Sequence, residues 1–275
     1  MGNAVVESLA ASFPEAELRL LPKQHLDIAD KDQVEKLFIS LEPDILVNLA
    51  AYTKVDLAEK EKEEAFRANA TGPETLARAC HKSGCRLIHI STDYVFDGRK
   101  KEAYLEDDPV NPIGHYGATK LEGEKRIMDQ MDDYLILRVS WLYGPGGPNF
   151  VRTMITKGKQ LGKLKVVNDQ TGAPTYTKDV ANAISRLIPT SASGVYHVTN
   201  AGKCTWYEYA MEIFSIAGLD HIEVSPVTTS EFPTPAKRPE NSLMDNSKYN
   251  ALTGKPMRHW KEALADYLSM GEEGL

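Results

Sequence analysis

The sequence contains no long apolar run. Nowhere among its 275 residues do roughly 18 or more hydrophobic positions follow one another, as a membrane-spanning helix requires. The first residues, 1–7, lack the basic start and the apolar centre of a signal peptide. We therefore expect no membrane partner and a cytoplasmic location.

Basic residues are in the minority. Lysine and arginine number 32 against 39 aspartates and glutamates, which gives a net charge of -7 at pH 7. Proteins that bind nucleic acid usually have a basic face, so we expect no nucleic-acid partner. An anionic small ligand is still compatible with this charge, because a single site can be locally basic.

Cysteine is scarce, and no histidine cluster is present. Cys80, Cys85 and Cys204 are odd in number and form no CxxC pair, so we interpret them as buried free thiols in a reducing compartment. The seven histidines show no HxxH or HxxxH spacing. We therefore expect no catalytic metal.

Apolar extended segments alternate with amphipathic helical ones along most of the chain. The expected strands are 17–21, 45–50, 87–90, 135–139 and 194–198, and the expected helices are 4–12, 30–40, 63–82, 118–131, 149–160, 179–188, 205–217 and 260–268. This alternation predicts an α/β fold with a Rossmann-like, doubly wound parallel sheet. Right-handed crossovers would bring the carboxyl ends of the strands to one edge, where such sheets bind ligands.

A tyrosine and a lysine four residues apart, Tyr116 and Lys120, occupy the start of a predicted helix. Positions i and i+4 share one helix face, so both side chains can meet the same reactant. An ammonium group would favour the phenolate and lower the tyrosine pKa from about 10 towards the range useful for proton transfer. Such pairs also occur by chance, but Thr92 adds a hydroxyl at the end of the apolar run 87–90. Together the three residues indicate a site for proton transfer.

Six stretches in one order resemble a known family. They are 48–56, 91–98, 116–124, 138–144, 168–175 and 235–242. The first three resemble the extended short-chain dehydrogenase/reductases in general. The stretches around Trp141, Asn168 and Pro235 are similar to those of the dTDP-4-dehydrorhamnose reductases within that family.

The resemblance implies an NADPH- or NADH-dependent reduction of the C4 ketone of dTDP-4-dehydro-β-L-rhamnose to dTDP-L-rhamnose. Tyr116 would donate a proton to the carbonyl oxygen, and Thr92 would hydrogen-bond the same oxygen as it gains charge. Lys120 would lower the tyrosine pKa and bind the nicotinamide ribose. Further cofactor contacts are implied for Gly2, Asp27, Ile28, Ala51, Tyr52, Thr53 and Ile90.

The substrate contacts implied by the resemblance lie later in the chain. Asp93 and Trp141 would contact the sugar, Trp141 as an apolar platform. Lys237 and Arg238, in a proline-rich loop, are either a solvated pair or the partners of the substrate diphosphate. We expect an NAD(P)-binding domain at 1–143 plus 176–200 and a smaller C-terminal substrate-binding lobe at 144–175 and 201–275. Relatives often dimerise, some with magnesium at the contact, so a homodimer and a magnesium ion are expectations as well.

The usual opening of a dinucleotide-binding sheet is not found. Gly2 is followed directly by a helical segment, without the apolar strand and most of the glycine-rich turn that normally precede it. Either the sequence is shortened there or the fold works without that strand. Lys23, after the 17–21 run, favours the 2'-phosphate of NADPH, although the choice of cofactor stays open.

Two other functions are compatible with the same residues. Another extended-family enzyme acting on a nucleotide sugar, such as an epimerase, would share Thr92, Tyr116 and Lys120, but has less reason to contain the Trp141 and Pro235 stretches. A non-catalytic regulatory subunit of the same fold would tolerate loss of the first strand. The intact set of three residues argues against this last alternative.

Overall fold

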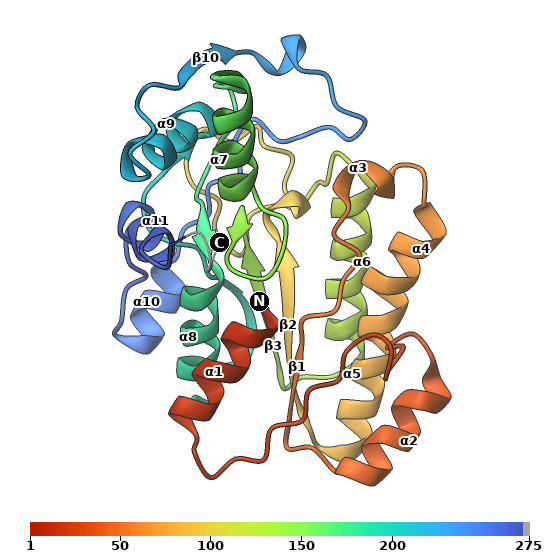
Figure 1. Cartoon of the computed structure of the whole chain (residues 1–275). Coiled ribbons are helices and arrows are strands. Elements are labelled where there is room, and N and C mark those ends of the chain that lie inside the picture. The colour runs from red at the N-terminus through yellow and green to blue at the C-terminus, as the bar shows by residue number, and fades with distance from the viewer. Residues whose placement is uncertain (272–275) are drawn as a thin grey trace.

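The computed structural model describes residues 1–271 and is built around a parallel four-stranded sheet (Figure 1). Its strands, in spatial order, are β1 (Ile45–Asn48), β2 (Arg86–Thr92), β3 (Tyr134–Val139) and β8 (Gly194–His197). All three strand pairs are parallel. The apolar residues of β2 and β3 are almost fully buried, as expected for central strands covered on both faces. The predicted α/β class is confirmed.

Helices cover both faces of this sheet (Figure 1). One side carries α2 (Lys31–Leu41), α4 (Lys62–Phe66), α5 (Gly72–Ser83) and α6 (His115–Gln130). The other side carries α1 (Gly2–Ser12), α8 (Thr177–Leu187) and α10 (Ser247–Thr253). Two apolar clusters fill the space between the sheet and these layers, one around Ile88, Leu135 and Ile184, the other around Leu76 and Leu87.

A second group of elements packs above the carboxyl ends of the strands (Figure 1). It comprises α7 (Phe150–Leu161), β5 (Lys163–Val167), α9 (Trp206–Ile216), β10 (Glu223–Val227) and α11 (Trp260–Leu268). Its own core contains the buried aromatics Tyr143, Tyr209 and Tyr267. The remaining strands are short: β4 (Leu142–Tyr143) pairs with β7 (Thr175–Tyr176), and β6 (Thr171–Gly172) pairs with β9 (Cys204–Thr205).

The helix starts follow the capping residues in the sequence. The Asp30 side chain accepts hydrogen bonds from the backbone N–H groups of residues 32 and 33. Asn149 and Thr205 cap α7 and α9 in the same way, and Thr205 forms a reciprocal capping box with Glu208. The predictions for these helices are confirmed to within one or two residues.

The predicted strand at 17–21 is wrong, because this segment is coil. Leu20 and Leu21 are 55% and 38% exposed, and no neighbouring strand supplies a ladder of hydrogen bonds. Within residues 1–271, β1 forms one edge of the main sheet and no strand precedes α1.

The predicted helix at 63–82 contains an interruption. It consists of α4, a π-helical turn η1 (Arg67–Thr71) and α5. All three cysteines are free and buried, as expected.

No helix in the described part of the chain is both long enough and apolar enough to cross a membrane.

Candidate active site

The site begins where β2 ends. Thr92 and Asp93 follow the buried strand and are only 4% and 2% exposed. The Thr92 hydroxyl accepts a hydrogen bond from the Tyr94 backbone N–H at 3.2 Å and donates one to Asp93 Oδ1 at 3.0 Å. The threonine side chain is therefore held in one orientation at the carboxyl edge of the sheet.

Helix α6 approaches this edge unusually closely. A Cβ atom at Gly117 would lie 2.1 Å from the carbonyl oxygen of Tyr94, far inside van der Waals contact. Glycine is therefore required for α6 to reach the chain that follows β2. This contact carries the adjacent Tyr116 against the site, with its ring edge-on to Tyr94 at a centroid distance of 5.6 Å.

Tyr116 and Thr92, predicted to act together, are neighbours in the structure. Burial raises the pKa of Tyr116 to about 12, and the nearby Thr92 hydroxyl acts in the opposite direction without overcoming it. Tyr116 is consequently a neutral phenol, the form that can donate a proton. The causes of this shift do not include Lys120, whose side-chain nitrogen faces His89 and the Ile90 carbonyl oxygen. That Lys120 lowers the tyrosine pKa stays a prediction for the site with its cofactor.

Lys120 lies one turn further along α6 and is 1% exposed. Its ammonium nitrogen donates to the carbonyl oxygen of Ile90 at 2.6 Å and lies 3.1 Å from Nε2 of His89. Burial lowers the pKa of Lys120 to about 8, with the charge of Glu124 acting in the opposite direction. Thus Ile90, predicted to contact cofactor, positions the lysine through its backbone.

A buried ion pair supports the same region. Glu124 on α6 and Arg138 on β3 form two hydrogen bonds, from Arg138 Nη2 to Glu124 Oε2 at 2.7 Å and from Nε to Oε1 at 3.0 Å. The Ser91 hydroxyl also donates to Glu124. These contacts fix α6 relative to the two central strands.

Asp93 is the acidic group nearest to the threonine and tyrosine. Burial raises its pKa to about 6, and the nearby hydroxyls of Ser242 and Thr92 act in the opposite direction. Its Oδ2 atom has no hydrogen-bond partner among the described residues. A ligand hydroxyl would satisfy this buried oxygen.

The residues that follow β1 form the neighbouring edge. Ala51 and Thr53 are exposed, whereas Tyr52 is buried and its backbone is held by Asn69. The Asn69 side chain accepts from the Tyr52 N–H at 2.8 Å and donates to the Tyr52 carbonyl oxygen and to Thr119 Oγ1, each at 3.1 Å. This clamp orders the exposed backbone on either side of Tyr52.

Asp27 and Ile28 lie against the π turn η1 and the start of α5. Asp27 forms an ion pair with Arg67 at 2.6 Å, and Ile28 packs directly on Gly72. Gly2 begins α1, and a Cβ atom there would meet no other atom within 4 Å.

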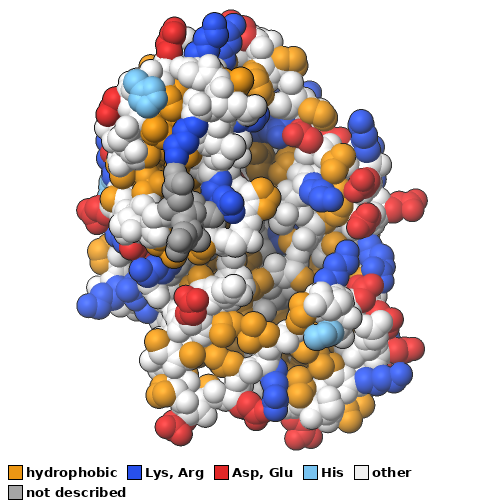
Figure 2. Space-filling view, in the orientation of Figure 1, with side chains coloured by type: hydrophobic (Ala, Val, Ile, Leu, Met, Phe, Trp, Pro, Cys, Tyr) orange, Lys and Arg blue, Asp and Glu red, His pale blue; other side chains and the backbone are white. Residues whose placement is uncertain are grey.

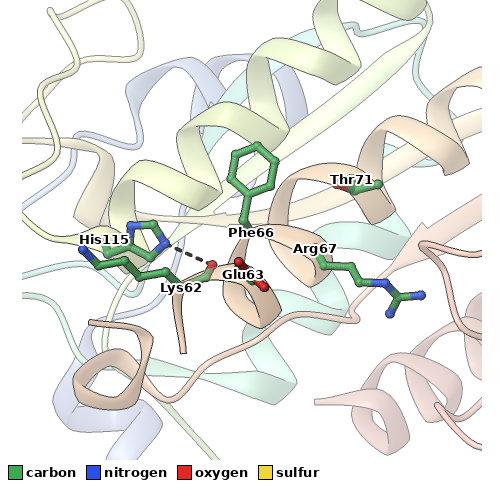
Figure 3. A pocket seen from close by; sticks show the side chains of 6 residues that line it. All are labelled: Lys62, Glu63, Phe66, Arg67, Thr71 and His115. Atoms are coloured by element: carbon green, nitrogen blue, oxygen red, sulfur yellow. Dashed lines mark hydrogen bonds between the residues drawn. The ribbon is translucent and has the colours of Figure 1, made fainter. Parts of the chain in front are cut away.

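A pocket of about 490 Å³ lies against α4 and the π turn (Figure 3). Its lining residues are Lys62, Glu63, Phe66, Arg67, Thr71 and His115. His115 Nε2 lies 3.2 Å from the carbonyl oxygen of Lys62, so the start of α6 is joined to α4 at this point. The pocket contains none of Thr92, Tyr116 and Lys120, and it lies beside the proton-transfer residues rather than over them.

Trp141 has a backbone φ of 44°, which is rare for a residue other than glycine. Its indole stacks on that of Trp206 with a centroid distance of 3.5 Å and an interplanar angle of 9°. Glycine at position 172 lets β6 lie against the Trp141 ring, because a Cβ atom there would be 2.6 Å from that ring. The predicted sugar platform is thus held by a second tryptophan.

Lys237 and Arg238 line a second pocket, of about 370 Å³, with Arg99 and Glu240 among its other residues. Arg238 is also engaged by Asp56 in a bidentate ion pair, with Nη1–Oδ1 at 2.5 Å and Nη2–Oδ2 at 2.8 Å. The proline-rich loop is therefore tied to the residues that follow β1. Figure 2 shows the molecular surface hollowed near the middle, between the layer with α1 and α8 and the layer with α5 and α6.

Several residues at the site carried no recognised signal in the sequence. Asn69 lies in a π turn, which no periodicity marked, and Gly117 resembled any helical glycine. His89 and Glu124 are a buried residue of a strand and a helical acid, whose neighbours only the tertiary structure defines. No group of three or more histidines, cysteines or acidic residues within 1–271 is arranged to hold a metal ion.

The chain matches the family model for the RmlD substrate binding domain over residues 1–272. It is 42% identical over 252 residues to the spore coat polysaccharide biosynthesis protein SpsK of Bacillus subtilis, covering 92% of this chain and 88% of that protein. It is 40% identical over 257 residues to a dTDP-4-dehydrorhamnose reductase of Streptomyces griseus, covering 91% and 84%. The structure is similar, with a TM-score of 0.94 and 41% identity, to that of a dTDP-4-dehydrorhamnose reductase from Bacillus anthracis in complex with NADP, covering 98% and 95%.

Proposed function

Since the chain belongs to the dTDP-4-dehydrorhamnose reductase family, we propose that it reduces the C4 ketone of dTDP-4-dehydro-β-L-rhamnose to give dTDP-L-rhamnose. The family makes it an NAD(P)H-dependent oxidoreductase of deoxysugar-nucleotide biosynthesis. One observation carries the assignment of the reaction: a neutral Tyr116 phenol, next to the Thr92 hydroxyl, lies one helical turn from a buried lysine.

The residues fit a nicotinamide cofactor along the carboxyl edge of the sheet. The exposed backbone of Ala51 and Thr53 and the half-buried Ile90 offer a groove edge, and Asp27 and Ile28 would border the adenine. Gly2, at the start of α1, would face the pyrophosphate. Bound NAD(P)H would supply the hydride.

Three side chains would handle the proton and the developing charge. Tyr116 holds its proton firmly and would donate it to the C4 oxygen as the ketone is reduced. Thr92 would hydrogen-bond the same oxygen, and so stabilise the charge that appears only in the transition state. Lys120 would bind the ribose and be positioned by the Ile90 carbonyl oxygen.

The sugar nucleotide would lie on the side of the second group of elements. Asp93 has an unpartnered carboxylate oxygen for a sugar hydroxyl, and Trp141 presents a ring backed by Trp206. Lys237 and Arg238, which line one pocket, would meet the diphosphate, with Lys237 the more available because Arg238 is paired to Asp56. The lobe made of 144–175 and 201–275 would accordingly bind substrate and the remainder would bind cofactor.

Four further assignments belong to the same proposal. Lys23 favours NADPH over NADH, because a basic residue in this region would contact the 2'-phosphate. A cytoplasmic location fits the three free, buried thiols. A homodimer, with magnesium at its contact, completes the set, and sedimentation with and without a chelator would test it.

The test is a turnover assay with the purified chain. NADPH and NADH consumption is followed by absorbance with dTDP-4-keto-6-deoxy-L-mannose as substrate. We expect turnover with the unmodified chain and a loss of at least about 100-fold in kcat for Tyr116→Phe, which retains the ring but lacks the proton. Cofactor binding with no turnover would instead favour a non-catalytic role, and equal turnover by the Tyr116→Phe protein would refute the assignment of the proton donor.

A further inference from the structure

A chain of buried hydrogen-bonding groups leads from β1 to the catalytic lysine. Asn48 on β1, His89 on β2 and Lys120 on α6 are 4%, 0% and 1% exposed. Asn48 Nδ2 lies 2.9 Å from His89 Nδ1, and His89 Nε2 lies 3.1 Å from Lys120 Nζ. All three side chains are therefore shielded from bulk water.

The direction of the hydrogen bonds is set at the β1 end. The backbone N–H of Ala50 can only donate, and it donates to Asn48 Oδ1 at 3.0 Å. The amide nitrogen of Asn48 therefore faces His89, and His89 Nδ1 must accept. A neutral imidazole carries one ring proton, so this proton is on Nε2 and points at Lys120.

The proton on His89 Nε2 affects the protonation of Lys120. An Nε2–H group opposite an ammonium places two donors against each other, whereas a neutral amine can accept from Nε2–H and still donate to the Ile90 carbonyl oxygen at 2.6 Å. The histidine does not relieve this conflict by taking up a second proton, because burial holds its pKa well below the usual range. A charged ammonium would need a bare Nε2 and a proton on Nδ1 of His89. The Asn48 amide would then have to flip so that its oxygen faces Nδ1, and its hydrogen bond with the Ala50 N–H would be lost.

The charges around the lysine do not override this polarity. Glu124 is the acid on the same helix, and its bidentate pair with Arg138 on β3 offsets its charge. On the segment after β2, Asp93 has a raised pKa and Tyr94 is a phenol. On the other elements that pack on α6, Asp56 pairs with Arg238, Arg67 pairs with Asp27, and Glu74 pairs with Arg78 and with Arg126 of α6.

We propose that His89 is a positioning residue for the reductase: through the Asn48–His89–Lys120 chain, it favours the neutral amine form of Lys120. The catalytic lysine would then change its protonation state within the working pH range, since its pKa of about 8 lies there. The role in turnover rests on the proposed function, but the hydrogen-bond polarity does not.

The first test reads the polarity directly and needs no activity. Histidine labelled with ¹⁵N in the full chain gives separate signals for protonated and bare ring nitrogens, and the signal lost in His89→Gln identifies His89. Above pH 8, we expect His89 to carry its proton on Nε2. A proton on Nδ1 under these conditions would overturn the proposal.

The second test uses the pH dependence of kcat/KM. In His89→Gln, an amide oxygen can face Lys120 and accept from the ammonium. The inflection due to Lys120 should therefore move upward by about one pH unit, a tenfold change in its acid dissociation constant. Ile88→Val is the matched control, because Ile88 is equally buried in β2 but lies outside the chain, and its profile should not move. Equal inflections in the His89→Gln and unmodified proteins would refute the proposal, and a chain without turnover would leave the ¹⁵N result to decide it.

Discussion

The ion pair between Glu124 and Arg138 should be among the most sensitive points of the structure. The two side chains are 0% and 4% exposed, and two hydrogen bonds join them. Glu124→Gln keeps the shape of the side chain but leaves the guanidinium of Arg138 buried without a countercharge. Breaking a buried pair from one side typically costs about 3–5 kcal/mol. We expect the free energy of unfolding of the variant to fall by that amount.

Urea unfolding followed by circular dichroism would measure this loss. Glu122→Gln is the matched control, since Glu122 lies on the same helix and pairs with Arg126, but the two side chains are 37% and 29% exposed. Exposed pairs contribute at most about 1 kcal/mol. The double variant Glu124→Gln, Arg138→Met should be more stable than Glu124→Gln alone, because no unpaired charge remains. A loss below about 1 kcal/mol in Glu124→Gln would show that water or another group compensates Arg138, and the reasoning would be refuted.

Three further predictions concern the residues around the site. Asp93→Asn should remove a pH dependence of the free energy of unfolding. Burial raises the Asp93 pKa from 3.8 to about 6, so the protonated carboxyl stabilises the fold fully below pH 3.8, and this stabilisation is lost as the pH rises through 6. Urea midpoints measured across that pH range would detect the loss in the unmodified protein and its absence in the variant. Gly98→Ala should cost more stability than Gly146→Ala, because both have a positive φ but only at Gly98 would the new Cβ lie 2.5 Å from a proline; equal midpoints would contradict this. Trp206→Ala should raise KM for the sugar nucleotide severalfold by freeing the Trp141 ring, and an unchanged KM would exclude the stack from substrate binding.

Local signals were sufficient for most helices and central strands. Asp30, Asn149 and Thr205 each satisfy backbone N–H groups of the helix that follows, so the helix starts could be predicted from single residues. The segment 17–21 shows the limit of such signals. Its apolar residues fit a strand, but a strand also needs a neighbour, and sequence periodicity does not supply one. The two-residue strands such as β6 and β9 depend on tertiary contacts for the same reason.

Local sequence signals also predict only part of the candidate site. Tyr116 and Lys120 could be predicted as a pair because one helical turn separates them, and Thr92 because it ends a strand. The hydrogen bonds of Lys120 could not be, since His89 and Ile90 precede it by 31 and 30 positions and meet it only in the folded chain. The spacing predicted that the Lys120 ammonium acts on Tyr116, whereas in the folded chain the Lys120 nitrogen contacts His89 and Ile90 of β2.

Burial drives the ionisable groups at the centre of the site towards their neutral forms. The pKa of Asp93 rises to about 6 and that of Tyr116 to about 12, while that of Lys120 falls to about 8. The nearby Glu124 and Arg138 remain a paired exception. A ketone that receives a hydride gains negative charge on oxygen, and in such surroundings a fixed hydroxyl and a neutral phenol would stabilise this charge more strongly than they would in water. The burial that lowers the pKa of Lys120 is therefore also the property that keeps Tyr116 protonated until the ketone oxygen would gain charge.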